Sequence, residues 1–166
     1  MKQLLVSFTH YEYWANERLL QVIMELTEEQ QQQEIISSFP SVHKTFLHIW
    51  DASTIWWQRL QKAEEIIVPS LSFHPSLEDV EKGLLNQNRD WIAWVKDVSE
   101  EELESILPYK SMKGDSYAQP VKEIVLHLNN HGTYHRGQLV TMLRQLGVTK
   151  IPQVDYILFS RSGNIQ

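Results

Sequence analysis

The chain has 166 residues, of which 42% are apolar and 22% charged, and its 15 Lys and Arg against 21 Asp and Glu give a net charge of −6. This length is enough to bury a full hydrophobic core, so we expect one domain over residues 1–166. The negative charge, with no local cluster of Lys and Arg, argues against nucleic acid as a partner.

The chain contains no cysteine and no long apolar run. The lack of cysteine excludes disulfides, thiolate metal ligands and a cysteine nucleophile, and it is typical of a reducing compartment. The first residues turn polar at Thr9, too early for the apolar region of a signal peptide. Because a membrane-spanning helix needs about 18 apolar residues, we expect a soluble, cytoplasmic protein with no membrane contact.

The first half of the chain predicts two helices. Apolar residues recur every three or four positions over residues 4–26, which is the spacing that lines one face of an α-helix. The sequence Thr-Glu-Glu-Gln at 27–30 matches a capping box and indicates a break with a short turn of helix. A second helix is expected from Ser41, directly after Pro40, to about residue 63.

The second half predicts two further helices. Two prolines interrupt the pattern before Ser76, which is a good N-cap for a third helix over 77–98. Periodicity is lost over 99–119, where Lys-Gly-Asp at 113–115 suits the turn of a small hairpin. The fourth helix starts at Pro120 and ends before Gly147. Four amphipathic helices with little strand predict an all-α fold, a four-helix bundle.

The fourth predicted helix carries the most informative residues of the chain. His127, His131 and His135 follow one another at steps of four, whereas a shuffled chain with seven His would show about 0.01 such runs of three. On a helix, side chains at this step lie one turn apart on one face, so two imidazoles could bind one ion. The spacing therefore predicts a metal site that includes His131 and His135.

The third ligand is left open between two histidines. His127 would extend a straight row, in which three side chains do not easily surround an ion. His48, near the middle of the second predicted helix, would give a better facial arrangement, and we prefer it. Three imidazoles leave a coordination position free, as in catalytic sites. Zinc, nickel, iron or cobalt would each accept these ligands, and the spacing does not rank them; the expectation taken forward is zinc or nickel, with iron, cobalt or manganese as alternatives.

Other readings of single residues compete with these. A lone inward His is more often a hydrogen-bonded core residue than a ligand. Asp51 could orient an imidazole, but a carboxylate on the helix surface is the more common case. Arg136 is expected to be exposed or ion-paired, although it could anchor an anionic group near the site. Gly132 and Gly137 each cost about 1 kcal/mol in a helix and indicate close helix approach or space beside the histidines. The remaining histidines are expected on the surface or in loops: His10, His43 and His74.

Several well-known metal and phosphate motifs are missing from the sequence. It contains no His-Glu-x-x-His, no Glu-x-x-His and no glycine-rich phosphate loop. These absences argue against a zinc protease, a di-iron bundle and a nucleotide-binding enzyme.

The sequence resembles the DinB-like family, the DinB/YfiT group, over nearly its whole length. The resemblance rests on three segments and His48; the segments are Tyr-Trp-Ala-Asn-Glu-Arg-Leu at 13–19, Asn-His-Gly-Thr-Tyr-His-Arg-Gly-Gln at 130–138 and Leu-Arg-Gln-Leu-Gly at 143–147. The resemblance implies a bundle with up-down-down-up topology, a homodimer, and one divalent ion held by His48, His131 and His135. Related families are thiol transferases that use bacillithiol or mycothiol, or thiol-dependent isomerases.

Three functions follow as expectations. The first is a transferase in which the ion activates a low-molecular-weight thiol to attack an electrophilic small molecule. The second is a hydrolase in which metal-bound water attacks an ester or amide, with His127 or Asp51 as general base. The third is a stress protein whose ion only stabilises the bundle. The resemblance favours the transferase.

Overall fold

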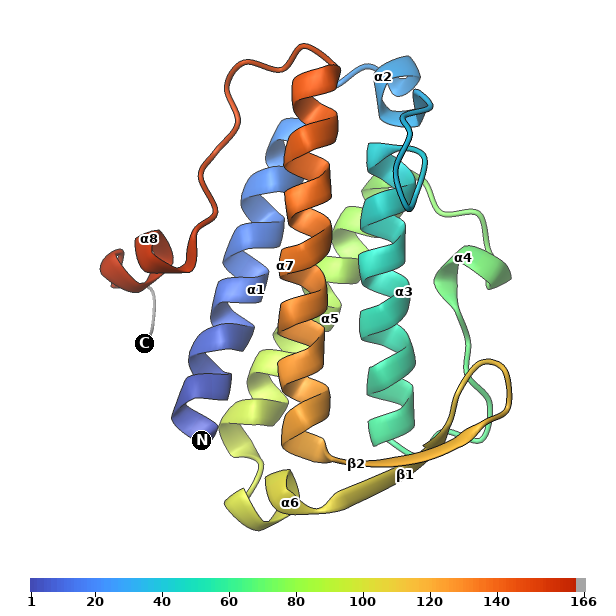
Figure 1. Ribbon diagram of the computed structural model, residues 1–166, viewed down its shortest axis with the longest axis vertical. Coiled ribbons are helices and arrows are strands. Elements are labelled where there is room, and N and C mark those ends of the chain that lie inside the picture. Colours follow the sequence, from blue (N-terminus) through green and yellow to red (C-terminus); the bar gives the residue numbers. More distant parts are fainter. Residues whose placement is uncertain (164–166) are drawn as a thin grey trace.

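The computed structural model describes residues 1–163, and the chain is mostly helical (Figure 1). Four long helices pack side by side along the long axis of the molecule. Helices α1 and α3 each contact both α5 and α7. The four long helices are α1 (Lys2–Met24), α3 (Val42–Leu60), α5 (Leu77–Asp97) and α7 (Val121–Gln145).

Shorter elements connect the long helices. The expected turn of helix after the first long helix is present as α2, and the expected hairpin is an antiparallel pair in which Tyr109 faces Tyr117. This two-stranded sheet is the part of the fold that an all-α class leaves out. The single-turn helices α4 and α6 were not predicted. The shorter elements are α2 (Glu28–Gln32), α4 (Pro69–Ser72), α6 (Glu100–Glu104), β1 (Ile106–Lys110), β2 (Ser116–Pro120) and α8 (Tyr156–Arg161).

Side-chain caps explain where the helices begin. The Ser41 hydroxyl accepts a hydrogen bond from the backbone N–H of Lys44, and Ser76 and Asp79 form a reciprocal capping box at the start of α5. Thr27 caps α2 in the same way. After α7, Gly147 adopts a φ of +83°, which glycine permits without strain. These local signals are the ones that the sequence displays.

A polar layer lies between two of the three apolar clusters that residues 1–163 form in the interior. One cluster joins Leu20, Phe46 and Leu143 in the half of the molecule near α2, and the other joins Leu5 and Val125 in the half near α6. Between them, the long helices bury polar side chains at the same level of the bundle: Glu12, Asn16, Asp51, Ser53, Gln87, Asn88, Asn129, His135 and Arg136. The expected histidine site lies in this layer.

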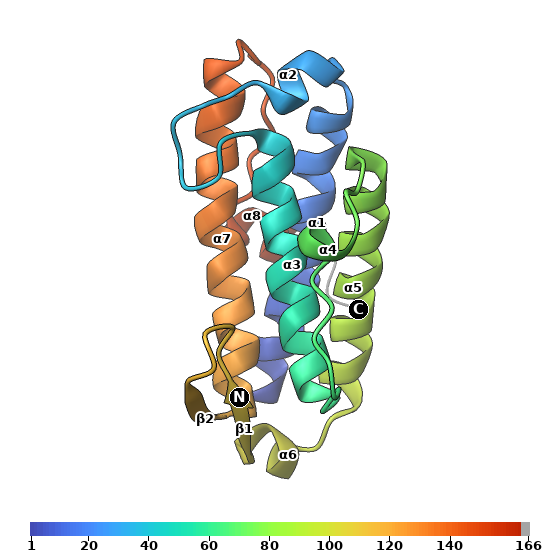
Figure 2. The same ribbon diagram turned by 90° about the vertical axis from the view of Figure 1, so that its right-hand side faces the viewer.

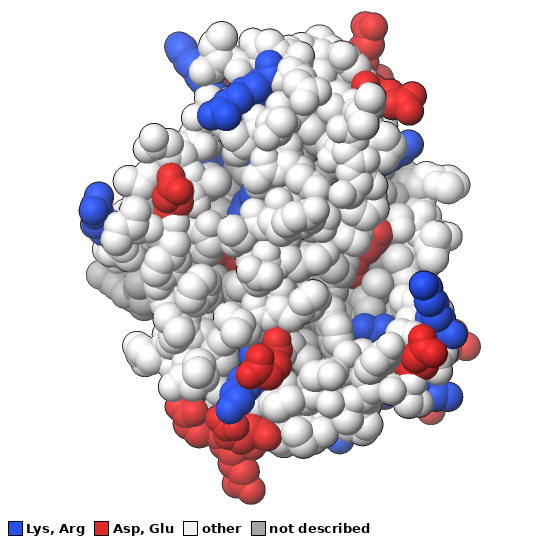
Figure 3. Space-filling view, in the orientation of Figure 1, with Lys and Arg blue, Asp and Glu red and all other residues white. Residues whose placement is uncertain are grey.

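The outer surface adds two observations. Figure 2 shows α4 lying over α3, on the side of α3 that the other long helices leave free. Figure 3 shows scattered charges on the face of the molecule seen in Figure 1, with acidic side chains gathered at the end where α6 lies. Over residues 1–163, none of the helices has the length and apolar character of a membrane span.

Candidate metal centre

Three histidines from two helices meet in the polar layer. His131 and His135 lie one turn apart on α7, with their rings edge to face, and His48 faces them from α3. The Nε2 atoms of His48 and His131 are 3.0 Å apart. One ring nitrogen from each of the three histidines can be chosen so that all three lie within 4.8 Å of one another. Packing of α3 against α7 therefore brings together residues that are far apart in the sequence.

This donor set fits a divalent ion. With metal–nitrogen bonds of about 2.0–2.1 Å, the ligand nitrogens of a tetrahedral site lie about 3.3 Å apart. The separation of 3.0 Å between His48 and His131 is close to this value, and it also suits an N–H···N hydrogen bond between the two rings in the metal-free protein. The three imidazoles are the kind of ligand that zinc, nickel, cobalt and iron accept.

The electrostatics of the site favour neutral rings. Burial lowers the pKa of His48 to about 4, and the nearby His135 adds to this effect. Burial lowers the pKa of His131 to about 3, again with contributions from the neighbouring imidazoles. The pKa of His135 is lowered by burial and partly restored by its hydrogen bond to Gln138. At neutral pH each ring is therefore uncharged and keeps one lone pair for an ion.

Gln138 orients the ring of His135. The Gln138 side-chain amide donates to the Ser38 hydroxyl over 3.1 Å, so its oxygen is free to accept from Nδ1–H of His135 over 2.8 Å. This hydrogen bond places the proton on Nδ1 and leaves the Nε2 lone pair for coordination. Sequence reasoning did not find this role, although the step of three residues from His135 to Gln138 was a usable signal.

Phe39 covers one side of the histidine cluster. Its ring stacks on His48 with centroids 3.9 Å apart and an interplanar angle of 21°, and its edge packs against His135 at 5.6 Å. The short loop that carries Phe39 is closed by a hydrogen bond from the Ile35 N–H to the Pro40 carbonyl. The same loop supplies Ser38. One loop thus contacts the surroundings of two of the three histidines.

The structure separates the two candidates for the third ligand. The ring of His127 lies 5.7 Å from that of His131 and packs on Trp56 at the same distance, outside the group of three close nitrogens. His48 occupies the position that completes the cluster. The geometry therefore favours His48 over His127.

Asp51 is neither a surface carboxylate nor a hydrogen-bond partner of a histidine in the cluster. It is buried, so the expectation of a surface carboxylate is wrong. Its oxygen accepts a hydrogen bond from the backbone N–H of Ser70, in the first turn of α4. Burial raises the pKa of Asp51, and the bonds to Ser70 oppose this shift. Asp51 ties α4 to α3, and among the hydrogen bonds of residues 1–163 none joins it to a histidine of the cluster.

The other histidines are distributed as follows. His74 is exposed in the loop before α5, as expected. His10 is partly buried on α1, and burial lowers its pKa. His43 lies on α3 and joins two segments, because its ring bonds both to the Gln32 amide at 2.6 Å and to the Pro75 carbonyl at 3.0 Å. The simple surface expectation for His43 is therefore incomplete.

A buried ion pair between α7 and α1 lies next to the histidine cluster. Arg136 is only 1% exposed, which rules out the exposed position, and it pairs with Glu12 at 2.7 Å. Gly132 makes room for this pair, since a Cβ there would lie 1.9 Å from Glu12 Oε1. At Gly137, by contrast, a Cβ would meet no atom of residues 1–163 within 4 Å, so this glycine marks no close helix approach.

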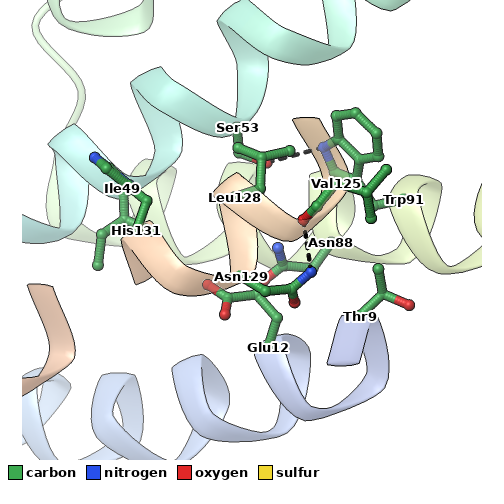
Figure 4. A pocket seen from close by; sticks show the side chains of 10 residues that line it. All are labelled: Thr9, Glu12, Ile49, Ser53, Asn88, Trp91, Val125, Leu128, Asn129 and His131. Carbon is green, nitrogen blue, oxygen red and sulfur yellow. Dashed lines mark hydrogen bonds between the residues drawn. The ribbon is translucent and has the colours of Figure 1, made fainter. Parts of the chain in front are cut away.

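A small cavity adjoins this pair on the inner side of His131. Figure 4 shows its lining, in which Glu12 comes from α1, Asn129 and His131 from α7, and Trp91 donates to the Ser53 hydroxyl. Its volume of about 20 Å³ is sufficient for roughly one water molecule. The inner side of the cluster is thus closed to larger molecules.

These features define a helical protein with a candidate three-histidine metal centre. The chain belongs to the DinB family, whose model matches residues 1–165. It is 30% identical over 164 residues to Protein DinB of Bacillus subtilis strain 168, with 92% of each chain covered.

Two solved structures share the fold. A DinB-like protein from Bacillus cereus superposes with a TM-score of 0.67 at 23% identity, covering 87% of this chain and 91% of the other. A DinB-like protein from Bacillus subtilis gives a TM-score of 0.65 at 13% identity, covering 92% and 98%. At these identities the two structures support the fold alone.

Proposed function

We propose that this protein binds one divalent metal ion through His48, His131 and His135, and that it is a metal-dependent enzyme acting on a low-molecular-weight thiol. The observation that carries the proposal is the group of three neutral imidazole nitrogens within 4.8 Å of one another. Zinc or nickel is the preferred ion, because imidazole ligands suit both. In this proposal the long helices form the up-down-down-up bundle of the DinB/YfiT group, and their pairwise packing supports it.

The residues around the cluster have separate tasks in this proposal. Gln138 fixes the tautomer of His135, and Phe39 holds the plane of the His48 ring. A bound divalent ion would supply positive charge that favours the anionic form of a thiol or of water. With three protein ligands, one side of the ion stays open for the reacting molecule. The thiol sulfur would then bond to the electrophilic carbon of the substrate as the leaving group departs with the electron pair.

Two alternatives follow from the same site. A hydrolase would use water in place of the thiol, and His127 would be the better general base, since the Asp51 carboxylate is engaged by Ser70. A metal-binding stress protein would need the ion for stability alone. Both alternatives keep the three ligands, but water would react at the site of the hydrolase and nothing would react at the site of the stress protein.

Metal binding and catalysis can be tested one after the other. Titration of the metal-free protein with zinc, nickel or cobalt should show one ion per chain and a higher melting temperature. The loaded protein should then consume low-molecular-weight thiols with 1-chloro-2,4-dinitrobenzene, releasing chloride, in a reaction that a chelator stops. Stabilisation by metal without thiol turnover or ester cleavage would favour the stress protein, and a failure to bind one ion would reject the proposal.

The oligomeric state is a separate part of the proposal. A homodimer is expected from the family, and light scattering after size-exclusion chromatography measures it directly. A mass equal to one chain over a range of concentrations would reject the dimer without affecting the metal site.

A further inference from the structure

Three hollows each have His48, His127 or His131 in their wall, and their sizes differ greatly. The cavity on the inner side of His131 has about 20 Å³, which is room for one water. A hollow beside His127, walled by Trp56 and Tyr109, has about 260 Å³, but its lining includes none of the three close histidines. A groove of about 420 Å³ has His48 in its wall. Because small-molecule sites measure about 300–1,000 Å³, this groove is the hollow with both the size and the contact to the cluster.

The walls of the groove combine four apolar residues with polar side chains from Gln32, His43, Ser70 and His74. Phe39, Leu47, Leu71 and Pro75 line it together with His48. Its charged lining residues are Lys44 and Asp51, one of each sign, and the Asp51 carboxylate is already engaged by the Ser70 N–H. The lining therefore offers apolar contact area and no net charge, which suits an uncharged group.

The groove is braced on both sides by hydrogen bonds between separate segments. Asp51 holds α4 against α3 on one side. On the other side, His43 joins Gln32 of α2 to the carbonyl of Pro75. A site whose walls are already fixed loses little conformational entropy when a ligand enters. The bond from Ser70 to Asp51 explains how α4, a helix of one turn, is held in place.

The exposure of the Leu71 side chain on α4 is not explained by packing within the protein. Leu71 lines the groove and remains 78% exposed, while the residues on either side of it tie α4 to the bundle or end it. An exposed leucine at the mouth of a cavity gains stability when an apolar group covers it. Leu71 is thus placed to contact a ligand rather than the core.

We propose that the groove between Phe39 and Leu71 binds the uncharged apolar part, aromatic or branched alkyl, of the electrophilic small-molecule substrate. The role as substrate site rests on the proposed function, whereas the binding of an apolar molecule does not. Phe39 and His48 both line the groove, so this part of the substrate would lie directly beside one histidine of the cluster.

The groove can be probed without metal. N-phenyl-1-naphthylamine, an uncharged aromatic fluorophore, should bind the metal-free protein saturably with one site per chain. Leu71→Gln should weaken this binding about fivefold, through lost apolar contact. Leu126→Gln is the matched control, because Leu126 is 42% exposed on α7 and lies outside the groove lining, and it should leave binding unchanged.

The outcomes separate this inference from the metal proposal. Saturable binding that depends on Leu71 and is unaffected at Leu126 supports the groove. Absence of saturable binding, or equal weakening in both variants, overturns it. A doubling of mass on size-exclusion chromatography that Leu71→Gln abolishes would assign the surface to a second copy of the chain and also overturn it. If only the metal proposal is wrong, adding cobalt would give no visible absorption from a bound ion, while the fluorophore would still bind.

Discussion

The Nε2 atoms of His48 and His131 lie 3.0 Å apart, although 83 positions separate the two residues in the chain. This proximity depends on the packing of α3 against α7 and on the neutral state of both rings. It leads to predictions about metal binding, stability and pH dependence.

The first prediction concerns the identity of the ligands. His48→Ala and His135→Ala should each abolish stoichiometric metal uptake, because two imidazoles leave the ion weakly held. His127→Ala should retain one ion per chain, since His127 lies outside the cluster. Isothermal titration with zinc measures all three variants. Full uptake by His48→Ala, or loss of uptake by His127→Ala, would show that the ligand set is wrong.

Gln138 provides a second prediction. Gln138→Ala removes the acceptor that holds Nδ1–H of His135, and metal affinity should fall about 10- to 100-fold while the fold is retained. Gln145→Ala, near the end of the same helix and exposed, should leave the affinity unchanged. Competition with a chromophoric chelator resolves a change of this size. An unchanged affinity in Gln138→Ala would refute the orienting role.

The two glycines of α7 should respond in opposite directions to the same substitution. Gly132→Ala should destabilise the protein, because the new methyl would collide with the Glu12 carboxylate of the buried ion pair. Gly137→Ala meets open space and should stabilise the helix by up to about 1 kcal/mol. Urea denaturation of the metal-free variants measures both. Equal effects at the two positions would contradict the close approach at Gly132.

Breaking the buried ion pair should be costly. Glu12→Gln leaves the guanidinium of Arg136 without its partner in the interior, and such changes cost about 3–5 kcal/mol. Glu104→Gln breaks the more exposed pair with Lys122 and should cost about 0–1 kcal/mol. The comparison uses melting curves and urea titration. Similar losses in both variants would mean that the buried pair contributes no more than a surface pair.

The lowered pKa values of the cluster predict a pH dependence of stability. In the metal-free folded protein, His48 and His131 stay neutral down to about pH 4 and pH 3, whereas in the unfolded chain they take up protons near 6.5. The unfolded state therefore binds more protons between these values, and stability should fall as the pH is lowered from 6.5 towards 4.

Matched substitutions test this pH dependence. Replacing His131 by Asn should make the fall less steep, because it removes one of the rings whose pKa is lowered most strongly. Replacing the exposed His74 by Asn should leave the fall unchanged. Melting temperatures over this pH range provide the measurement, and an equal slope in wild type and both variants would contradict the assignment.

Much of the helix pattern could be predicted because its signals are local. The serine caps at 41 and 76, the capping box at 27–30 and the glycine at 147 each act within a few residues. The histidine pair on α7 was also predictable, since a step of four residues sets a side-chain distance within one helix.

The remaining parts of the site depend on long-range packing. Burial of Arg136 requires Glu12 from the opposite end of the chain, and the position of Asp51 requires α4, a single turn with no apolar period. Phe39 and Ser38 lie in a loop whose path has no repeating pattern. These contacts form only after the helices have packed, so they cannot be predicted from the spacing of residues within one segment.

The polar layer between the two apolar clusters has a consequence for the alignment of the helices. Sliding α1 or α7 by one turn, about 5.4 Å, would push Glu12, Asn16 or Arg136 into an apolar end and leave its partner alone. The layer therefore fixes the alignment of these helices along their axes relative to the helices they pack against. His131 and His135 lie on α7 in this layer, so the residues that cost most to bury also fix the height of two residues that could hold an ion.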